Sequence, residues 1–194
     1  KEPWSYLMKN KIGLSTFVLA SPFSNNDLSL MGKVKSMGYD VLEICIEDTA
    51  LLSSEAMSVA AKNYGLDISI CGAFGPDRDI SHEDPTIRAQ GITYLNTCID
   101  FAAEVGSPFV SGPMYSATGK TRLLSPEERK QQFDWAGESI AVVAGYAQAK
   151  GVGLAIEPLN RFETDLINNT LVVPCYLKLL KIKGIFGWRE PTSM

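Results

Sequence analysis

The stretch "VGLAIEPLNRFETD", residues 152–165, joins an apolar run to a cluster of charged side chains. The apolar part, residues 152–156, is typical of a buried strand, and Glu157 follows it directly. Pro158 then ends the ladder, because proline has no N–H to donate to a neighbouring strand. An acid in this place has two explanations. It either belongs to a solvated loop or closes a strand by pointing its carboxylate into a cavity.

Four earlier apolar stretches are similar to this one, and amphipathic helical patterns separate them. Strands are predicted at residues 12–20, 39–46, 66–74, 107–114 and 152–158. Helices are predicted at residues 26–38, 53–65, 85–105 and 125–150. Parallel strands need a crossover connection between them, and a helix commonly provides it. The alternation therefore predicts an α/β protein with a parallel sheet that is buried on both faces.

The ends of the predicted strands decide between an open doubly wound sheet and a (β/α)8 barrel. A nucleotide-binding open sheet carries a glycine-rich turn after its first strand, and "ASPFSNND", residues 20–27, is no phosphate cradle. Polar or special residues instead follow the later strands: Glu43 and Glu47, Cys71 and Gly72, Gly112 and Pro113, Glu157 and Glu163. In a barrel these ends meet at one catalytic face. We therefore predict an incomplete TIM (β/α)8 barrel with about five βα units.

The domain prediction has three parts. Residues 1–7 are interpreted as an extension or tag, because Met8 begins a sequence that leads straight into the first strand. Residues 8–170 form the partial TIM-barrel domain, and residues 171–194 form an atypical tail in which Pro174 interrupts the helical pattern. The abrupt loss of pattern predicts a truncated or frameshifted product, or a fragment. Two open parallel edges favour self-association, so a homo-oligomer is possible.

The composition excludes some classes of partner. The chain has 194 residues and a formal net charge of −4, with no basic patch before residue 178, which argues against a nucleic-acid partner. Its four cysteines lie far apart, which suits a reducing compartment and predicts a cytoplasmic location. It contains no apolar run of about 18 residues, so no membrane span is expected. A small-molecule enzyme and a protein-binding module both remain open.

Two acids and their neighbours are the first candidates for chemistry. Glu157 is suited to bind Mg²⁺ or Mn²⁺ or to transfer a proton, and the alternative is a loop acid paired with Arg161. Glu163 is suited to hold substrate hydroxyls, and the alternative is a capping or surface role. Arg161 is interpreted as an ion-pair partner that orients one of these acids. Asn160 is interpreted as support for the turn.

Four further residues lie in or after the earlier strands. Glu43, inside an apolar run, is either buried and paired or at the mouth of the sheet, because unpaired burial is costly. Cys71 is either a small buried hydrophobe or a pocket-lining side chain. His82, the single histidine, is interpreted as a solvated loop residue rather than a catalyst or metal ligand. Tyr115 is placed at the border of a substrate pocket.

Four motifs together resemble one family. They are "VLEICIED" (41–48), "SICGAFGPDRDISHEDPTIRAQGI" (69–92), "SGPMYSATGK" (111–120) and, most specifically, "IEPLNRFETDLIN" (156–168). They are similar to the ketose 3-epimerases, the D-tagatose and D-psicose 3-epimerase group of the xylose-isomerase-like superfamily. The resemblance covers about residues 8–169.

The resemblance implies a (β/α)8 barrel that binds one divalent ion, Mn²⁺ or alternatively Mg²⁺ or Co²⁺, at its C-terminal face. It implies that Glu157 is a metal ligand and one of two catalytic glutamates. It also implies that Glu163 contacts the sugar near its carbonyl end and that Cys71 lines the pocket. The implied reaction is epimerisation at C3 of a free ketose of the tagatose, psicose or fructose type, in which a proton is removed and returned through an enediolate.

This sequence departs from the family pattern after the fifth strand. An Asp, a His and a second Glu are expected as further metal ligands from later strands, and the chain ends before them. We therefore expect weak metal binding and impaired activity. Two alternatives remain: a DNA-repair barrel similar to endonuclease IV, against which the net negative charge and single histidine count, and a non-catalytic oligomerising remnant.

Overall fold

A computed structural model describes residues 10–169, which contain one sheet of five parallel strands. The strands follow one another in chain order: β1 (Gly13–Ser15), β2 (Val41–Ile46), β3 (Asp67–Gly72), β4 (Phe109–Gly112) and β5 (Gly153–Ile156). In the wall of a β/α barrel, strands that follow one another in sequence are also neighbours in space, as they are here. The predicted α/β fold with about five barrel units is confirmed.

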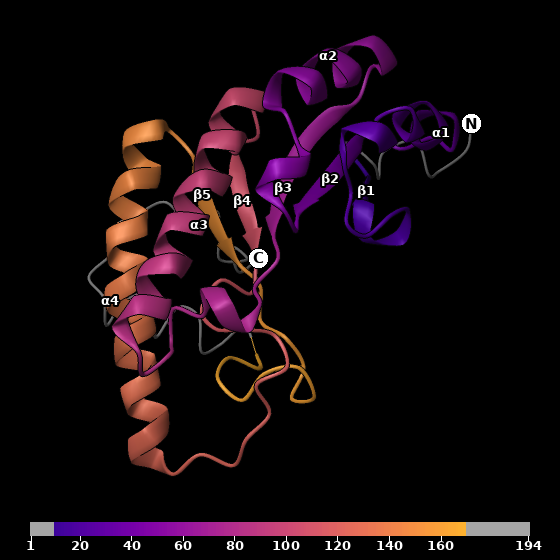
Figure 1. The fold of residues 1–194 in the computed structure, drawn as a ribbon. Coiled ribbons are helices and arrows are strands. Elements are labelled where there is room, and N and C mark those ends of the chain that lie inside the picture. Colours follow the sequence, from indigo (N-terminus) through magenta and orange to yellow (C-terminus); the bar gives the residue numbers. More distant parts are fainter. Residues whose placement is uncertain (1–9, 170–194) are drawn as a thin grey trace, which may run out of the picture.

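The helices lie on one side of this sheet, as Figure 1 shows for the three longer ones. They are α1 (Leu30–Ser36), α2 (Ser54–Tyr64), α3 (Pro85–Val105) and α4 (Pro126–Lys150). Local signals set their ends. Asp84 caps α3 by accepting a hydrogen bond from the N–H of Thr86 at 2.8 Å, and Ser125 forms a capping box with Glu128 at the start of α4.

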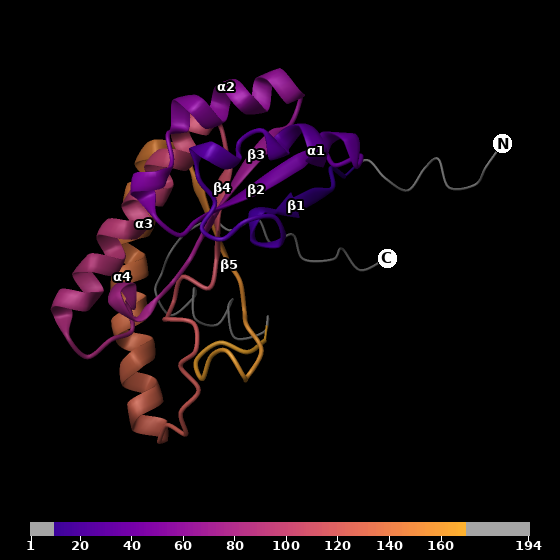
Figure 2. The ribbon, with the colours of Figure 1, turned by 45° about the vertical axis from the view of Figure 1, so that its right-hand side comes forward.

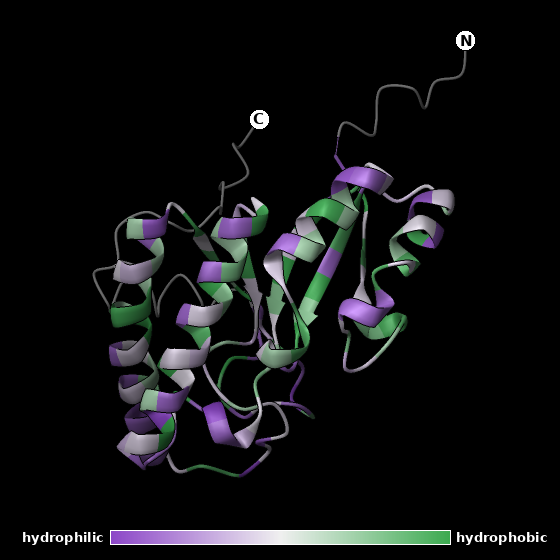
Figure 3. Ribbon diagram, turned by 45° about the horizontal axis from the view of Figure 1, so that its top comes forward, coloured by the Kyte–Doolittle hydropathy of each residue, from purple (hydrophilic) through white to green (hydrophobic). Residues whose placement is uncertain are grey.

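The sheet face that meets the helices is apolar. Successive side chains of a strand point to opposite faces, so alternate residues share one side. Leu42, Ile44, Ile70, Val110 and Leu154 belong to one cluster of buried side chains together with residues of α2, α3 and α4. Figure 3 shows hydrophobic residues along the strands and polar ones on the outer surfaces of the helices. Most of the hydrophobic core therefore lies between sheet and helices.

The opposite face of the sheet carries small and polar side chains. Ser15, Glu43 and Ser69 are partners in register across the first three strands. Cys71 and Ser111 are partners one pleat further along. Figure 2, turned from the view of Figure 1, shows the strands from β1 to β5 with α3 and α4 along one side of them. This face corresponds to the interior of a barrel.

The first unit differs from its prediction. The strand expected at residues 12–20 stops at Ser15, and a 3₁₀ turn over Thr16–Val18 follows. The hydroxyl of Thr16 accepts the N–H of Cys45 at 2.9 Å, so a side chain takes the donor that a longer ladder would use. The helix expected at residues 26–38 is also shorter, because a 3₁₀ turn with its own capping box precedes α1.

Two predicted segments, residues 1–7 and 171–194, lie outside the described residues. Among the helices of residues 10–169, none is long and apolar enough to cross a membrane.

Candidate active site at the mouth of the sheet

A cavity of about 690 Å³ opens at the carboxyl ends of the strands. Three of the predicted site residues, Cys71, Glu157 and Glu163, line it together. Glu43 and Glu47 add two further carboxyl groups from β2 and the loop behind it. The strand ends thus bring acids that are more than 100 positions apart in sequence to one wall, as the barrel prediction requires.

Glu157 stands at the end of β5, where its N–H donates to the carbonyl of Gly112 at 3.0 Å. Its carboxyl group borders the cavity and remains in contact with solvent. Partial burial raises the pKa of Glu157, and the negative charges of Glu43 and Glu163 raise it further. A carboxyl group with a raised pKa is better suited to exchange a proton near neutral pH than an ordinary surface acid is.

Glu163 is oriented by Asn160, not by Arg161. The side-chain amide of Asn160 donates to a carboxylate oxygen of Glu163, and its oxygen accepts the N–H of Phe162 at 2.8 Å. Arg161 lies over the ring of Phe162, 5.0 Å from its centroid. Within residues 10–169, no ion pair joins Arg161 to an acid. Its interpretation as an ion-pair partner was therefore wrong, because a neighbouring amide already orients the acid.

Glu43 and Cys71 are each buried at least in part and also line the cavity, so both alternatives given for each of them from the sequence apply. Glu43 is half-buried, accepts a hydrogen bond from the hydroxyl of Ser111 at 3.2 Å, and also borders the cavity. Cys71 is only 7% exposed, yet it lies on the cavity wall beside its register partner Cys45. Both side chains belong to the sheet face that turns away from the helices.

Tyr115 lies behind the cavity wall. Its side chain is fully buried, and its hydroxyl donates to the carbonyl of Ile167 at 2.9 Å and accepts the N–H of Leu159 at 3.2 Å. These bonds engage both ends of the loop that carries Glu163, so Tyr115 braces that loop instead of bordering the cavity. His82 also stays outside this cavity, where its Nδ1 accepts the N–H of Asp84 at 2.9 Å.

Arg78 was missed by the sequence analysis. Of the described residues that line the cavity it is the single cation, and its guanidinium lies 4.3 Å from the ring centroid of Tyr94. The same group donates to the carbonyls of Glu47 and Ala73, each at 3.3 Å. The charged "PDRD" directly after strand three was the available signal, but the contacts depend on a tyrosine 16 positions later.

Glu47 is a second acid whose surroundings the sequence did not reveal. One of its carboxylate oxygens accepts a hydrogen bond from the hydroxyl of Ser21 at 2.6 Å, and the other is buried and has no hydrogen-bond partner among residues 10–169. A buried oxygen of this kind is costly unless a ligand group satisfies it. Glu47 therefore offers an acceptor to whatever the cavity binds.

Gly112 keeps the mouth of the sheet narrow between β3 and β4. Its φ of +127° is a conformation that residues with a side chain rarely adopt. A Cβ at this place would lie 3.0 Å from the carbonyl oxygen of Gly72 and 3.1 Å from the ring of Phe74. The close approach of backbone to backbone here shapes the wall next to Cys71.

The cavity contains oxygen donors of the kind that bind divalent metal ions. Carboxylate oxygens suit Mn²⁺ and Mg²⁺, and Glu157 is such a donor. Within residues 10–169, however, no three His, Cys, Asp or Glu side chains form a group that could hold a metal ion. Glu157 fits as a single ligand, and the described residues do not amount to a metal centre.

The sequence model of the family described as "Xylose isomerase-like TIM barrel" matches residues 31–173, about three-quarters of the chain. The parallel sheet and its acid-lined mouth agree with this class of fold. The chain belongs to the xylose isomerase-like TIM-barrel family.

The curated relatives that it matches are sugar epimerases. An L-ribulose 3-epimerase from Mesorhizobium japonicum is 28% identical over 159 residues, which cover 81% of this chain and 52% of the relative. A ketose 3-epimerase from Arthrobacter globiformis is 28% identical over 171 residues, which cover 88% of this chain and 58% of the relative. The chain thus spans about half the length of these relatives.

A solved structure of an L-ribulose 3-epimerase superposes with a TM-score of 0.82 and 25% sequence identity. The match covers 91% of this chain and 58% of that one. The predicted likeness to ketose 3-epimerases is therefore confirmed in both sequence and structure.

Proposed function

We propose that this chain carries part of the active site of a ketose 3-epimerase and that Glu157 exchanges the proton at C3 of the sugar. The observation that carries the proposal is Glu157 itself, a carboxyl group with a raised pKa that faces a cavity at the ends of the strands. The names of the curated relatives supply the reaction class. Because the chain spans about half of their length, the whole reaction is part of the proposal.

The other lining residues are assigned to substrate binding. Glu163, oriented by Asn160, accepts hydroxyl hydrogens near the carbonyl end of the ketose. Cys71 provides a small, soft wall that fits against the carbon chain. Tyr115 acts indirectly, since its hydroxyl holds the loop on which Glu163 stands. In the same proposal a second acid, on the opposite side of the sugar from Glu157, gives a proton to the other face of C3, which inverts that carbon.

The substrate is proposed to be a free ketose, not a sugar phosphate. Among residues 10–169, four carboxyl groups line the cavity and the guanidinium of Arg78 is the one cationic group that does. Like charges in a concave site repel a phosphate group, whereas hydroxyl groups find acceptors there.

We also propose that the site binds a divalent ion, Mn²⁺ or alternatively Mg²⁺ or Co²⁺. Among residues 10–169, Glu157 is the one ligand proposed for it. Such an ion would supply Lewis-acid stabilisation of negative charge. No step assigned here to Glu157, Glu163 or Cys71 depends on it.

A non-catalytic role as an oligomer is the second candidate. Within residues 10–169, β1 and β5 each pair with one neighbour only, so both sheet edges have free backbone groups. Self-association through these edges predicts a homo-oligomer. The domain division at residues 8–170 and a cytoplasmic location remain predictions of the same proposal.

The proposed function is tested by product analysis. The purified chain is incubated with Mn²⁺ and, in turn, D-tagatose, D-psicose and D-fructose, and the C3 epimers are separated by chromatography. We expect epimer formation by the wild-type chain and by Glu104→Gln, an exposed acid near the other end of the strands, and loss of it in Glu157→Gln. An unchanged rate in Glu157→Gln would contradict the proposal.

A further inference from the structure

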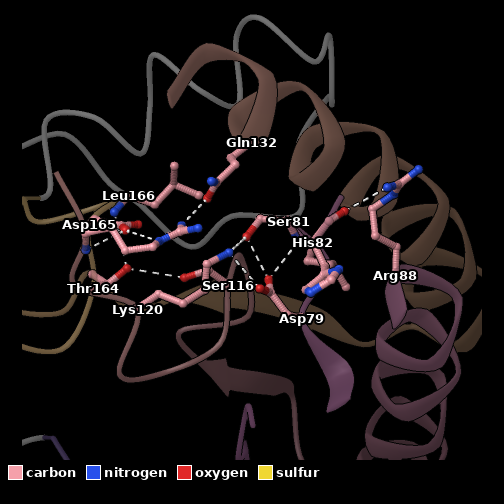
Figure 4. Close-up of polar contacts among 12 residues, drawn as sticks. Asp79, Ser81, His82, Arg88, Ser116, Lys120, Gln132, Thr164, Asp165 and Leu166 are labelled. Carbon is pink, nitrogen blue, oxygen red and sulfur yellow. Dashed lines mark hydrogen bonds and ion pairs between the residues drawn. The ribbon is translucent and has the colours of Figure 1, made fainter. Parts of the chain in front are cut away.

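A polar network connects the three loops that follow β3, β4 and β5, as Figure 4 shows. We name them the third loop (73–84), the fourth loop (113–125) and the fifth loop (157–168). The network lies beside the acid-lined cavity and not on its wall. Lys120, on the fourth loop, contacts both of the other loops.

The side chain of Lys120 is tied to the third loop. Its ammonium donates to a carboxylate oxygen of Asp79 at 2.6 Å and to the hydroxyl of Ser81 at 2.7 Å. Ser81 in turn donates to the other oxygen of Asp79 through its hydroxyl at 2.7 Å and its N–H at 2.9 Å. The side chain of Asp79 is 1% exposed and that of Lys120 is 17% exposed. Water therefore cannot easily replace these bonds, which fix the ammonium in one place.

The backbone beside Lys120 is tied to the fifth loop. The N–H of Gly119 donates to the carbonyl of Glu163 at 2.7 Å, and Lys120 forms a parallel bridge with Thr164. The hydroxyl groups of Ser116 and Thr164, both buried, lie 3.2 Å apart. Lys120, whose side chain binds Asp79, is thus the neighbour of Gly119, whose backbone N–H binds the carbonyl of Glu163.

A second connection runs in the same direction. Arg122 donates to one oxygen of Asp165 from both its N–H and its Nε, each at 3.0 Å, and its guanidinium also binds Gln132 of α4. Glu163 therefore lies in a segment that the fourth loop holds at two successive points. The first point depends on a buried ion pair, and the second depends on a partly exposed arginine.

We propose that Lys120 is a positioning residue for Glu163. Its ammonium, held by Asp79 and Ser81, fixes the fourth loop, and the backbone of that loop sets the place of Glu163 at the cavity. This inference rests on the proposed function, in which Glu163 binds the sugar. Lys120 itself does not line the cavity and is not a catalytic residue.

Amide hydrogen exchange tests the positioning without any need for activity. Lys120→Met keeps an unbranched side chain that is one atom shorter and removes its charge. We expect exchange of the Gly119 amide, which donates to the carbonyl of Glu163, and of the amides of residues 159–168 to accelerate on the order of tenfold, because this bond and the loop that it holds open more often. The matched control is Lys130→Met, which removes an exposed lysine that pairs with Asp134 along α4 and should leave that segment unchanged. Equal exchange in the two variants would overturn the proposal.

Steady-state kinetics separate positioning from a general loss of structure. We expect Lys120→Met to raise KM for the ketose about tenfold and to change kcat much less, since a displaced Glu163 weakens sugar binding. In a Glu163→Gln background the same substitution should change KM by less than about twofold, because the group it acts through is already removed. Equal effects in both backgrounds would contradict the proposal.

Two further outcomes are also decisive. If Lys120→Met does not fold, Ser81→Ala removes one acceptor of the ammonium and leaves the ion pair, and the same exchange and kinetic changes are expected with smaller size. If the wild-type chain epimerises none of the ketoses, the proposed function fails. Exchange in residues 159–168 then decides alone whether Lys120 holds the segment of Glu163.

Discussion

The two faces of the sheet are built from the same strands and differ in almost every other respect. On β2, Leu42 and Ile44 are fully buried against the helices, whereas Glu43 between them is half-buried and borders the cavity. On β3, Ile70 belongs to the core and Cys71 belongs to the cavity wall. One face therefore stabilises the fold, and the other positions polar groups for chemistry.

The difference between the two faces predicts which substitutions should change stability and which should change binding. Complete burial of an isoleucine or leucine contributes about 1.5–3 kcal/mol relative to exposure. A hydrogen-bonded serine at a partly open face contributes less, because water competes for its partner. The helix face should thus govern unfolding, and the cavity face should govern binding and proton transfer.

The largest effect is expected on the helix face. Ile44→Ala leaves a cavity in the centre of the core and should lower the free energy of unfolding by about 2–5 kcal/mol. Ser69→Ala, on the neighbouring strand β3 and the opposite face of the sheet, should cost less than about 1 kcal/mol, because it removes one oxygen atom and leaves no large cavity. Urea denaturation measures both. Similar losses in the two variants would remove the distinction between the faces.

The next effect concerns the buried ion pair beside the cavity. Asp79→Asn should cost about 1.5–3 kcal/mol at neutral pH, because the ammonium of Lys120 loses its charged partner. Burial opposes the charge of Asp79, but the hydrogen bonds from Lys120 and Ser81 outweigh it, so the pKa of Asp79 is lowered. A lowered pKa gives stability that is present above the unfolded pKa of about 3.9 and is lost as pH falls.

Urea denaturation between pH 2 and pH 7 checks this prediction. The wild-type chain should lose the contribution of Asp79 below about pH 4, and Asp79→Asn should show a weaker dependence on pH in that range. A variant that keeps the full acid dependence of the wild-type chain would show that Asp79 does not provide it.

Gly112 lies at the mouth of the sheet and Gly145 lies on α4. Substitution by alanine should lower the free energy of unfolding at the first and raise it at the second. Gly112→Ala places a Cβ against the backbone of β3 at a positive φ and should destabilise by about 1–3 kcal/mol. Gly145→Ala adds a methyl group to α4 with nothing within 4 Å and should stabilise by about 0.5–1 kcal/mol. Thermal unfolding gives both signs. A stabilising Gly112→Ala would mean that the mouth is not tightly closed.

The smallest effect is a shift in one titration. Glu43→Gln removes a negative charge beside Glu157, so the pKa of Glu157 should fall toward its usual value. Carbon-13 NMR of the glutamate side chains, with Glu157→Gln used for assignment, measures that change. Glu104→Gln, far from the cavity, should leave the titration of Glu157 unaltered. No shift in Glu43→Gln would mean that the two acids do not interact.

Local signals explain why much of the fold was predictable. Asp84 and Pro85 start α3 and Gly106 ends it, so the predicted range of 85–105 agrees with the helix found. The first strand was predicted too long, because its end depends on a bond between Thr16 and Cys45, 29 positions apart. Patterns within a few residues predict elements, and they do not reveal such distant contacts.

In the cavity, too, the features that depend on local sequence were predictable and those that depend on distant contacts were not. The strand ends placed Glu157 and Cys71 on one wall, since the carboxyl ends of barrel strands meet at one face. The stacking of Arg78 on Tyr94 and the burial of Tyr115 were not predictable, because each depends on how loops pack on distant residues. The orientation of Glu163 was assigned to Arg161 when the adjacent Asn160 provides it.

The proton at C3 tests the central claim most directly. Each ketose is incubated with the chain and Mn²⁺ in deuterium oxide, and proton NMR follows the signal at C3. The account predicts that deuterium enters C3 with the wild-type chain and with Glu104→Gln, and that the exchange is lost in Glu157→Gln. Exchange at C3 that is equally fast in Glu157→Gln would contradict the assignment of Glu157 as the group that moves this proton.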